Sequence, residues 1–424
     1  MNYDESLAWI HGRIKFGIKP GVKRMEWMLQ RLNHPERNIK GIHVVGTNGK
    51  GSTVSYLRNG LNANNYTVGT FTSPYIETFN ERISLDGRPI SDEAIAEIAD
   101  IVRPVSEDME TETDLGTATE FEIITMMMFV YFGRVQPVDF VVVEAGLGAT
   151  HDSTNVFNPV MTVLTSIGLD HTDILGDTLL DITKDKSGVI KSGVPLVFNV
   201  HDERSKDYVY KRLEEKGSLG MALNAEITIR SKNGEFDYQY KHYDFENIVL
   251  SMIGDHQKEN AALAITALLD MCERELIDID VNKTIEAVED TTWSGRIEKI
   301  SENPLIILDG AHNQEAVEAL VKTMETYYGD RKITVLFSAV KGKPLGSMTD
   351  RLSEIADEFV VTEFNFFKAM SADDIYKEVR HTEKRKVDDF IEYIDTFSGD
   401  VLLVTGSLYF ISDVKQHFNQ LNIT

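Results

Sequence analysis

The chain has 424 residues, which exceeds the size at which one hydrophobic core keeps growing, so two domains are expected. It is 42% hydrophobic and 26% charged, as in ordinary soluble globular proteins. The formal net charge of -25 works against a broad electrostatic grip on DNA or RNA, whose phosphates need clustered Lys and Arg, so nucleic acid is not expected as a partner.

Cysteine content and hydropathy indicate a protein of a reducing compartment. The single cysteine, Cys272, excludes an intramolecular disulfide and a thiolate-rich zinc cluster. The first residues lack the basic then apolar order of a signal peptide. The most apolar run, 123–132, is too short to span a bilayer, which takes about 20 residues, and we predict a buried helix there. We therefore expect a cytoplasmic protein with no membrane partner, and we also expect a monomer.

Short β-rich apolar runs alternate with helical patterns along the chain. This alternation predicts an α/β fold with parallel sheets covered by helices. The stretch 314–328 has helical spacing of its apolar residues and ends at Gly329, which completes a βαβ unit. The predicted strands are 42–45, 140–143, 160–164, 305–308, 333–337, 359–361 and 401–404.

Residues 225–250 show a different sequence pattern. Alternating residues flank Asn233-Gly234, a pair suited to a tight hairpin, which we assign to the first domain. Turn residues before Gly295 mark the expected boundary, giving domains 1–295 and 296–424. The acidic stretch 106–114 is interpreted as a solvated loop without a function.

A glycine-rich turn joins a strand to a helix start at residues 41–53. Glycines let backbone N–H groups converge on phosphate oxygens, and the helix directs its positive end at them. Lys50 supplies a charge, and Ser52 supplies a hydroxyl that can reach magnesium. The strict phosphate-loop pattern is not kept, because Val44 replaces its first glycine and Gly51 separates Lys50 from Ser52. The sequence favours a nucleotide site, with a plain glycine-rich turn as the alternative.

Two further predicted strands also end in polar residues. One ends in Glu144, and another ends near Ser166 and runs into Asp170 and His171. Open α/β sheets bind ligands at the carboxyl ends of strands, so Glu144 lies beside the phosphate loop if the two strands are neighbours. A carboxylate there suits magnesium. The alternatives are an acid that caps a turn and a structural histidine, and the recurrence at three strand ends favours a site.

Ten motifs, in this order over nearly the whole chain, resemble the Mur ligase superfamily. Within it they resemble bacterial folylpolyglutamate synthases, many of which are also dihydrofolate synthases. The motifs are GTNGKGST (46–53), TSPYIETFNERI (72–83), TEFE (119–122), EAGLG (144–148), DSTN (152–155), SIGLDHTDILG (166–176), KDKSGVIK (184–191), GDHQKENAA (254–262), SGRIE (294–298) and LDGAHN (308–313).

The resemblance implies a P-loop NTPase-like parallel-sheet domain with the ATP and folate sites, and a smaller Rossmann-like α/β C-terminal domain. It implies an ATP-dependent ligase that adds L-glutamate to a folate, and also to dihydropteroate, through an acyl phosphate. ATP, L-glutamate and the folate or dihydropteroate are then its small-molecule partners. The implied cofactor is magnesium, as two ions.

The resemblance also implies the site residues. A carbamate on Lys186 would turn a cation into a carboxylate that can ligate the second magnesium. The planar guanidinium of Arg296 suits a clamp on a transferring phosphoryl group. The implied ATP contacts are Asn48, Gly49, Lys50, Gly51, Ser52, Asn260, Arg296, Asp309 and His312; the magnesium ligands are Ser52, Ser73, Glu144, His171 and carbamylated Lys186; the catalytic residues are Lys50, His171 and Lys186; the folate or pterin contacts are Thr119, Glu120, Phe121, Glu122, His151, Asp152 and Ser153.

The chain departs from the family pattern at two positions. It reads Ala149-Thr150-His151 where the family commonly has an arginine, and Tyr75 stands where a histidine usually follows Ser-Pro. The alternative functions are another Mur-type amino-acid ligase, a non-ligase ATP-binding switch and a purely structural protein. A cell-wall Mur ligase usually carries an extra N-terminal domain, whereas here the phosphate loop begins only about 45 residues into the chain.

Overall fold

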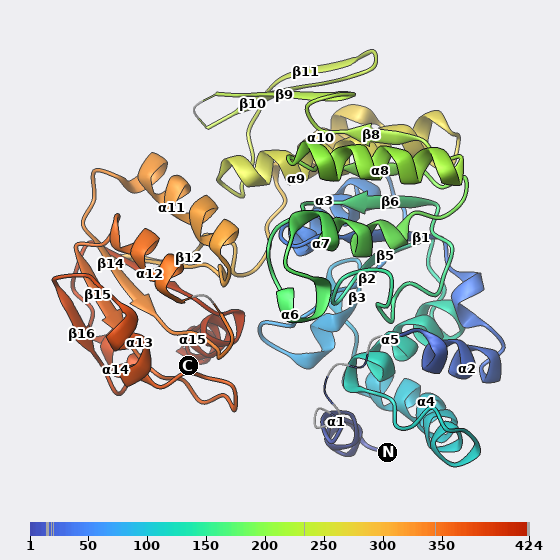
Figure 1. Cartoon of the computed structure of the whole chain (residues 1–424), viewed down its shortest axis with the longest axis horizontal. Helices are drawn as coiled ribbons and strands as arrows, with labels where there is room; N and C mark the ends of the chain where they lie inside the picture. Colours follow the sequence, from blue (N-terminus) through green and yellow to red (C-terminus); the bar gives the residue numbers. More distant parts are fainter. Residues whose placement is uncertain (14–16, 18, 20, 233, 344, 422–424) are drawn as a thin grey trace. The chain divides into compact units, whose positions relative to one another are not determined.

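The computed structural model describes residues 1–13, 17, 19, 21–232, 234–343 and 345–421. Within these residues the chain forms two compact units, each built around its own large sheet (Figure 1). The predicted α/β fold is confirmed, because parallel strands alternate with helices in both units. Unit 1 comprises Met1–Tyr75, Phe79–Ser251 and Lys258–Thr291, and unit 2 comprises Ile76–Thr78, Met252–Gln257 and Thr292–Thr424. The boundary at Gly295 between the ATP-binding domain and the C-terminal ligase domain stays a prediction.

The large sheet of unit 1 has the strand order β4-β3-β2-β5-β1-β6-β7-β8. Strands β2, β5, β1, β6, β7 and β8 run parallel. β1 and β5 are buried along their whole length, as expected for strands covered on both faces. The bounds are β1 Gly41–Val45, β2 Val68–Phe71, β3 Ile83–Leu85, β4 Arg88–Pro89, β5 Phe140–Glu144, β6 Met161–Leu164, β7 Leu196–Phe198 and β8 Gly220–Ala222.

Helices of unit 1 lie around this sheet, and α2, α4 and α5 pack together (Figure 1). The predicted buried helix at 123–132 is confirmed by α5, which ends at Val130 and continues as a short π-helical turn. The helix bounds are α1 Tyr3–His11, α2 Lys23–Arg31, α3 Lys50–Asn62, α4 Asp92–Glu112, α5 Glu120–Val130, α6 Thr172–Leu175, α7 Leu179–Lys186, α8 Glu203–Lys216, α9 Asp255–Glu273, whose first residues belong to unit 2, and α10 Val281–Glu289.

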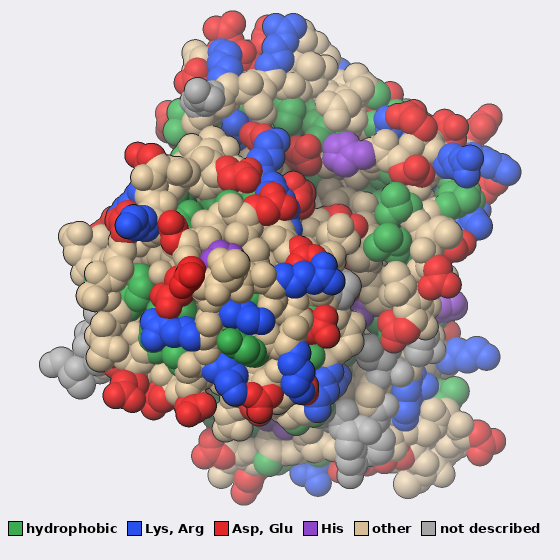
Figure 2. All heavy atoms as spheres, turned by 60° about the vertical axis from the view of Figure 1, so that its left-hand side comes forward, with side chains coloured by type: hydrophobic (Ala, Val, Ile, Leu, Met, Phe, Trp, Pro, Cys, Tyr) green, Lys and Arg blue, Asp and Glu red, His purple; other side chains and the backbone are tan. Residues whose placement is uncertain are grey.

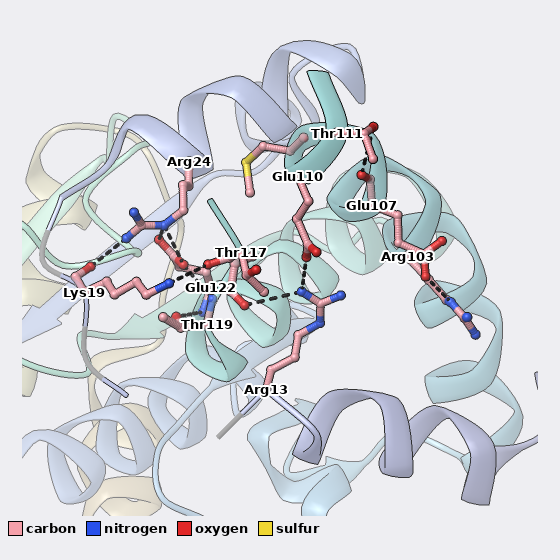
Figure 3. Close-up of polar contacts among 12 residues, drawn as sticks. Arg13, Lys19, Arg24, Arg103, Glu107, Glu110, Thr111, Thr117, Thr119 and Glu122 are labelled. Atoms are coloured by element: carbon pink, nitrogen blue, oxygen red, sulfur yellow. Dashed lines mark hydrogen bonds and ion pairs between the residues drawn. The ribbon is translucent and has the colours of Figure 1, made fainter. Parts of the chain in front are cut away.

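The interpretation of residues 106–114 as a solvated loop is wrong. Residues up to Glu112 form the last turns of α4, and Met109 is fully buried there. The apolar face of the helix continues through the acidic stretch, and its burial outweighs the acidic composition. The carboxylate of Glu110 pairs with the guanidinium of Arg13 at 2.7 Å (Figure 3).

We expect Met109→Ala to lower the free energy of unfolding by about 2–5 kcal/mol, because the change leaves a cavity in a packed core. Denaturant unfolding of the purified protein measures this loss. Glu107→Ala is the matched control on the same stretch, since its side chain is 49% exposed, and it is expected to stay within about 0.5 kcal/mol. Equal stability of the two variants would contradict the packing described for Met109.

The predicted hairpin is confirmed by the antiparallel pairing of β9 (Ile227–Ser231) with β10 (Phe236–Tyr240). In the predicted turn, Asn233 lies outside the described residues. A third strand, β11 (Tyr243–Ile248), pairs with β10 and completes a separate small sheet (Figure 1). These strands belong to unit 1, as expected.

The sheet of unit 2 has the order β12-β13-β17-β14-β15-β16. Its strands are parallel except for β12, which pairs antiparallel with β13. The predicted βαβ unit is confirmed by β13, α11 and β14. The bounds are β12 Glu298–Glu302, β13 Leu305–Leu308, α11 Gln314–Tyr328, β14 Ile333–Phe337, α12 Leu345–Ser353, β15 Glu358–Val361, α13 Ala372–Glu378, β16 Lys384–Lys386, α14 Phe390–Asp395, β17 Val401–Thr405 and α15 Leu408–Leu421.

The surface carries charges of both signs despite the acidic composition. Figure 2 shows Lys and Arg side chains interspersed among Asp and Glu on the face in view. Among the described helices, none combines the length and apolar character that a membrane crossing needs. Because the formal net charge is -25, attraction of an anionic ligand has to come from local groups rather than from the overall charge.

Candidate functional site

The condition on which Glu144 was expected beside the phosphate loop is met, because β1 and β5 are neighbours. β1 lies between β5 and β6, all parallel, with Val44 opposite Glu144 and Val45 opposite Leu164. The carboxyl ends of neighbouring parallel strands meet at one edge of the sheet, where open α/β sheets bind ligands. The phosphate loop, Glu144 and the segment after β6 therefore emerge side by side.

The phosphate loop leads directly into α3. Gly49 precedes the helix with a φ of 85°, a left-handed conformation that favours glycine. The Lys50 ammonium donates to the carbonyl oxygens of Gly46 and Thr47 at 3.1 and 3.2 Å. A Cβ on Gly49 would lie 2.3 Å from the side-chain oxygen of Asn260. The structure thus brings Asn260, from α9, against the predicted phosphate-binding residues of unit 1.

Two predicted magnesium ligands are adjacent at this edge. The backbone N–H of Ser73 donates to the Glu144 carboxylate at 3.2 Å, and Glu144 is buried. In the part of the chain that the structure describes, no group of three or more His, Cys, Asp or Glu side chains is arranged to hold a metal ion. Of the expected ligands only Glu144 and His171 are of these types. A buried carboxylate beside a serine suits a hard cation that prefers oxygen ligands.

His171 follows β6 and precedes the short helix α6. It adopts a left-handed backbone conformation with a φ of 50°, and its side chain is 45% exposed. Its Nε2 atom lies 4.0 Å from the Asp170 carboxylate. The ring thus lies on the loop between β6 and α6, in contact with solvent.

Lys186, at the end of α7, is buried, with 3% of its surface exposed. Burial lowers the pKa of its amine to about 7, and the nearby charge of Lys50 acts in the same direction, while Asp185 and Asp152 oppose the shift. The amine therefore has a substantial neutral fraction near neutral pH, which an exposed lysine lacks. The neutral amine is the form that reacts with carbon dioxide.

Two carboxylates hold the loop that follows β5. The Asp152 carboxylate accepts the backbone N–H groups of Gly146 and Leu147 at 3.0 and 2.8 Å. Asp185, beside Lys186, accepts the N–H of Ala149 at 2.8 Å. Burial raises the pKa of Asp152, and these hydrogen bonds oppose the shift. In this structure Asp152 supports the loop after Glu144, a role that the sequence did not reveal.

The candidate folate segment 119–122 forms the start of α5. The Thr119 hydroxyl and the Glu122 carboxylate cap each other's backbone N–H groups at 3.2 and 2.8 Å. The guanidinium of Arg24 pairs with Glu122 at 2.8 Å, and His11 lies 3.0 Å from Glu120. Figure 3 shows Arg24 reaching this helix start from the N-terminal part of the chain. Sequence reasoning missed both partners, because pairs so distant in sequence leave no local signal.

Phe121 packs beside the loop that follows Glu144. Its ring lies 5.8 Å from the ring of Phe71, and a Cβ on Gly146 would lie 2.5 Å from its edge. The other candidate folate segment, 151–153, touches the N-terminal part of the chain, where the N–H of Gly21 donates to the His151 carbonyl at 3.2 Å. His151 is exposed, whereas Asp152 and Ser153 are buried.

Both departures from the family pattern are packed into the structure. The Thr150 hydroxyl donates to the carbonyl of Asp185 at 2.6 Å. The ring of Tyr75 lies under the guanidinium of Arg82 at 5.3 Å. Thr150 thus fixes the loop to the end of α7, and Tyr75 contributes to an aromatic and cationic cluster.

The three candidate residues of unit 2 lie on two neighbouring loops, Arg296 before β12, and Asp309 and His312 after β13. The buried Asp309 follows β13 and accepts the N–H groups of Ile297 and Ala311 at 3.0 and 2.9 Å. Burial raises the pKa of Asp309, and Arg296 opposes the shift. The Nδ1 atom of His312 lies 2.8 Å from the Gly310 carbonyl, so this nitrogen carries the hydrogen.

Family models cover both units. The model for the Mur ligase middle domain matches residues 44–268, and the model for the Mur ligase glutamate ligase domain matches residues 295–408. The fold and the phosphate-loop edge thus define a Mur-type ligase. More specifically, the chain belongs to the folylpolyglutamate synthase and dihydrofolate synthase family of ATP-dependent ligases.

Individual relatives agree over nearly the full length. The chain is 42% identical over 424 residues to a dihydrofolate synthase/folylpolyglutamate synthase of Bacillus subtilis, covering 98% of both chains. It is 27% identical to the crystal structure of folylpolyglutamate synthase from Thermotoga maritima, with a TM-score of 0.88, covering 100% of this chain and 98% of that one. A solved FPGS-AMPPCP complex is 30% identical, with a TM-score of 0.86, covering 99% and 100%.

Proposed function

We propose that the chain joins the amine of L-glutamate to the carboxyl group of a folate, and also of dihydropteroate, using ATP. The observation that carries this proposal is that the phosphate loop and the buried Glu144 follow neighbouring parallel strands of unit 1. Asp185, next to the buried Lys186, is hydrogen-bonded to the loop after Glu144. The B. subtilis relative supports both acceptor substrates, and the relative solved with AMPPCP supports the nucleotide.

ATP contacts are proposed for each unit by itself. In unit 1, the loop Asn48–Ser52 and the positive end of α3 attract the phosphates, and the Lys50 ammonium neutralises charge on them. Asn260 adds a contact from α9. In unit 2, Arg296, Asp309 and His312 form the second set.

Magnesium is the proposed cofactor, as two ions. The residues that would hold it are Ser52, Ser73, Glu144, His171 and Lys186 as its carbamate. When bound, the ions neutralise charge on the phosphates. Glu144 supplies a fixed carboxylate whose position is set by the Ser73 N–H. Carbamylation converts the buried Lys186 amine into a second carboxylate, which removes the repulsion between two ammonium groups at this edge.

The proposed reaction proceeds in two steps. A carboxylate oxygen of the folate attacks the γ-phosphorus of ATP, the bond to the β-phosphate oxygen breaks, and an acyl phosphate and ADP form. The glutamate amine then attacks the acyl carbon, inorganic phosphate leaves, and the amine loses a proton. Lys50 stabilises the charge of the transferring phosphoryl group, and most of the rate gain comes from such preorganised charges.

The pterin end of the substrate is assigned to residues 119–122 and 151–153. Phe121 offers a flat ring beside the loop after Glu144, which suits stacking on a pterin. The buried carboxylates of Glu122 and Asp152 hold the two segments in place through their hydrogen bonds. A cytoplasmic location, in keeping with the free Cys272, completes the proposal, together with a monomeric state.

We expect incubation with ATP, magnesium and glutamate to add one glutamate residue to dihydropteroate, and one or more to tetrahydrofolate. Mass analysis of the products measures both reactions. ADP release should require glutamate and the acceptor together, because the acyl phosphate turns over only when the amine consumes it. ADP release without any acceptor would instead indicate a nucleotide switch, and extension of neither pterin would indicate another Mur-type ligase.

A further inference from the structure

The segment that follows β6 is hydrogen-bonded to the phosphate loop along successive residues. The backbone N–H of Thr47 donates to the carbonyl of Ser166 at 3.0 Å. The Thr47 hydroxyl donates to the carbonyl of Gly168 at 3.1 Å and accepts its N–H at 3.0 Å. These bonds extend the pairing of β1 and β6 beyond the ends of both strands.

The hydroxyls of Thr165 and Ser166 hold both backbone groups of Asn48. The Asn48 carbonyl accepts the Thr165 hydroxyl at 2.5 Å and the Ser166 hydroxyl at 3.0 Å. The Ser166 oxygen also accepts the Asn48 N–H at 2.9 Å. Thr165 is 1% exposed, and hydrogen bonds in such a buried setting are stronger than in water. The orientation of the Asn48 backbone is therefore fixed from one side.

The loop backbone also packs directly on the Thr165 side chain. A Cβ on Gly46 would lie 1.9 Å from the Thr165 hydroxyl oxygen, closer than any real contact. Gly46 therefore has to be glycine for the loop to reach this hydroxyl. The contact at Asn48 is thus one part of a close fit between the loop and the end of β6.

We propose that Thr165 and Ser166 are positioning residues for the nucleotide phosphates. A trans peptide directs its carbonyl and its N–H to opposite sides. Because the two hydroxyls hold the carbonyl of Asn48, the N–H of Gly49 points to the opposite side of this peptide. An N–H directed there attracts phosphate oxygens, and a carbonyl in its place would repel them. This inference rests on the proposed ATP site in the phosphate loop.

The experiment measures ADP binding by calorimetry, with magnesium, for the full-length protein. Thr165→Val, Ser166→Ala and the double variant remove the hydroxyls. We expect the double variant to bind ADP at least about tenfold more weakly and to raise the KM for ATP, while the KM for glutamate is unchanged. Thr165→Ser keeps the hydroxyl, and we expect this single variant to bind ADP within about twofold of the wild-type affinity.

Thr349→Val is the matched control. It removes another buried threonine hydroxyl, which donates to the carbonyl of Leu345 at 3.1 Å inside unit 2, and ADP affinity should not change. A folded double variant that binds ADP as the wild type does would overturn the inference. Should the double variant not fold, Ser166→Ala alone decides, because this half-buried side chain tolerates truncation. Failure of the wild type to bind ADP would instead overturn the proposed ATP site.

Discussion

Replacing Lys50 by alanine is expected to lower the rate of glutamate-dependent ADP formation by about a hundredfold or more. Removing one preorganised charge from a phosphoryl-transfer site typically costs about 3 kcal/mol in the transition state. The Lys50 ammonium is held in the loop by the carbonyls of Gly46 and Thr47. Coupled measurement of ADP release at saturating folate and glutamate gives the rate.

Two further variants separate charge from folding. Lys283→Ala, on the exposed face of α10, removes a lysine far from the phosphate loop in sequence and should leave the rate unchanged. Lys50→Arg keeps the charge but replaces a compact ammonium by a planar fork, so an intermediate rate is expected. Retention of most of the activity in a folded Lys50→Ala protein would contradict the role proposed for this side chain.

The part of the site that lies at strand ends could be predicted from the sequence. Buried parallel strands appear as continuous apolar runs, and the polar residues that follow them are brought to one edge whatever the details of the fold. This is why Glu144 could be expected beside the phosphate loop on the condition that the two strands are neighbours. The register of Val44 opposite Glu144 then confirmed the expectation.

Contacts between segments distant in sequence could not be predicted. The acidic stretch around Met109 looked like a loop, because its charges are local whereas the core that buries Met109 is assembled from other helices. Likewise, Thr165 and Ser166 are ordinary residues in the sequence, and they hold Asn48 only because β6 lies beside β1. The family resemblance named ligands and substrate contacts but said nothing of these supporting hydrogen bonds.

The second large effect concerns Lys186, whose replacement by alanine is expected to abolish activity. The proposed carbamate forms when the neutral amine bonds to the carbon of CO2 and releases a proton. The amine is suited to this reaction because burial lowers its pKa to about 7. A short carboxylate such as acetate should partly rescue Lys186→Ala, because it can take the place of the carbamate oxygens in the space that the side chain leaves. Turnover rates with and without acetate measure the rescue.

Lys184→Ala is the matched control, since this exposed lysine lies one half turn earlier on α7. Its ion pair is with the exposed carboxylate of Asp181. It should keep full activity and show no response to acetate.

The pH dependence follows from the pKa of Lys186. Below about pH 7 the amine is increasingly protonated and cannot react with CO2, so the wild type should depend more strongly on added bicarbonate at pH 6 than at pH 8. Full activity of Lys186→Ala without acetate would exclude a catalytic role for the carbamate, because alanine has no amine that could carry one.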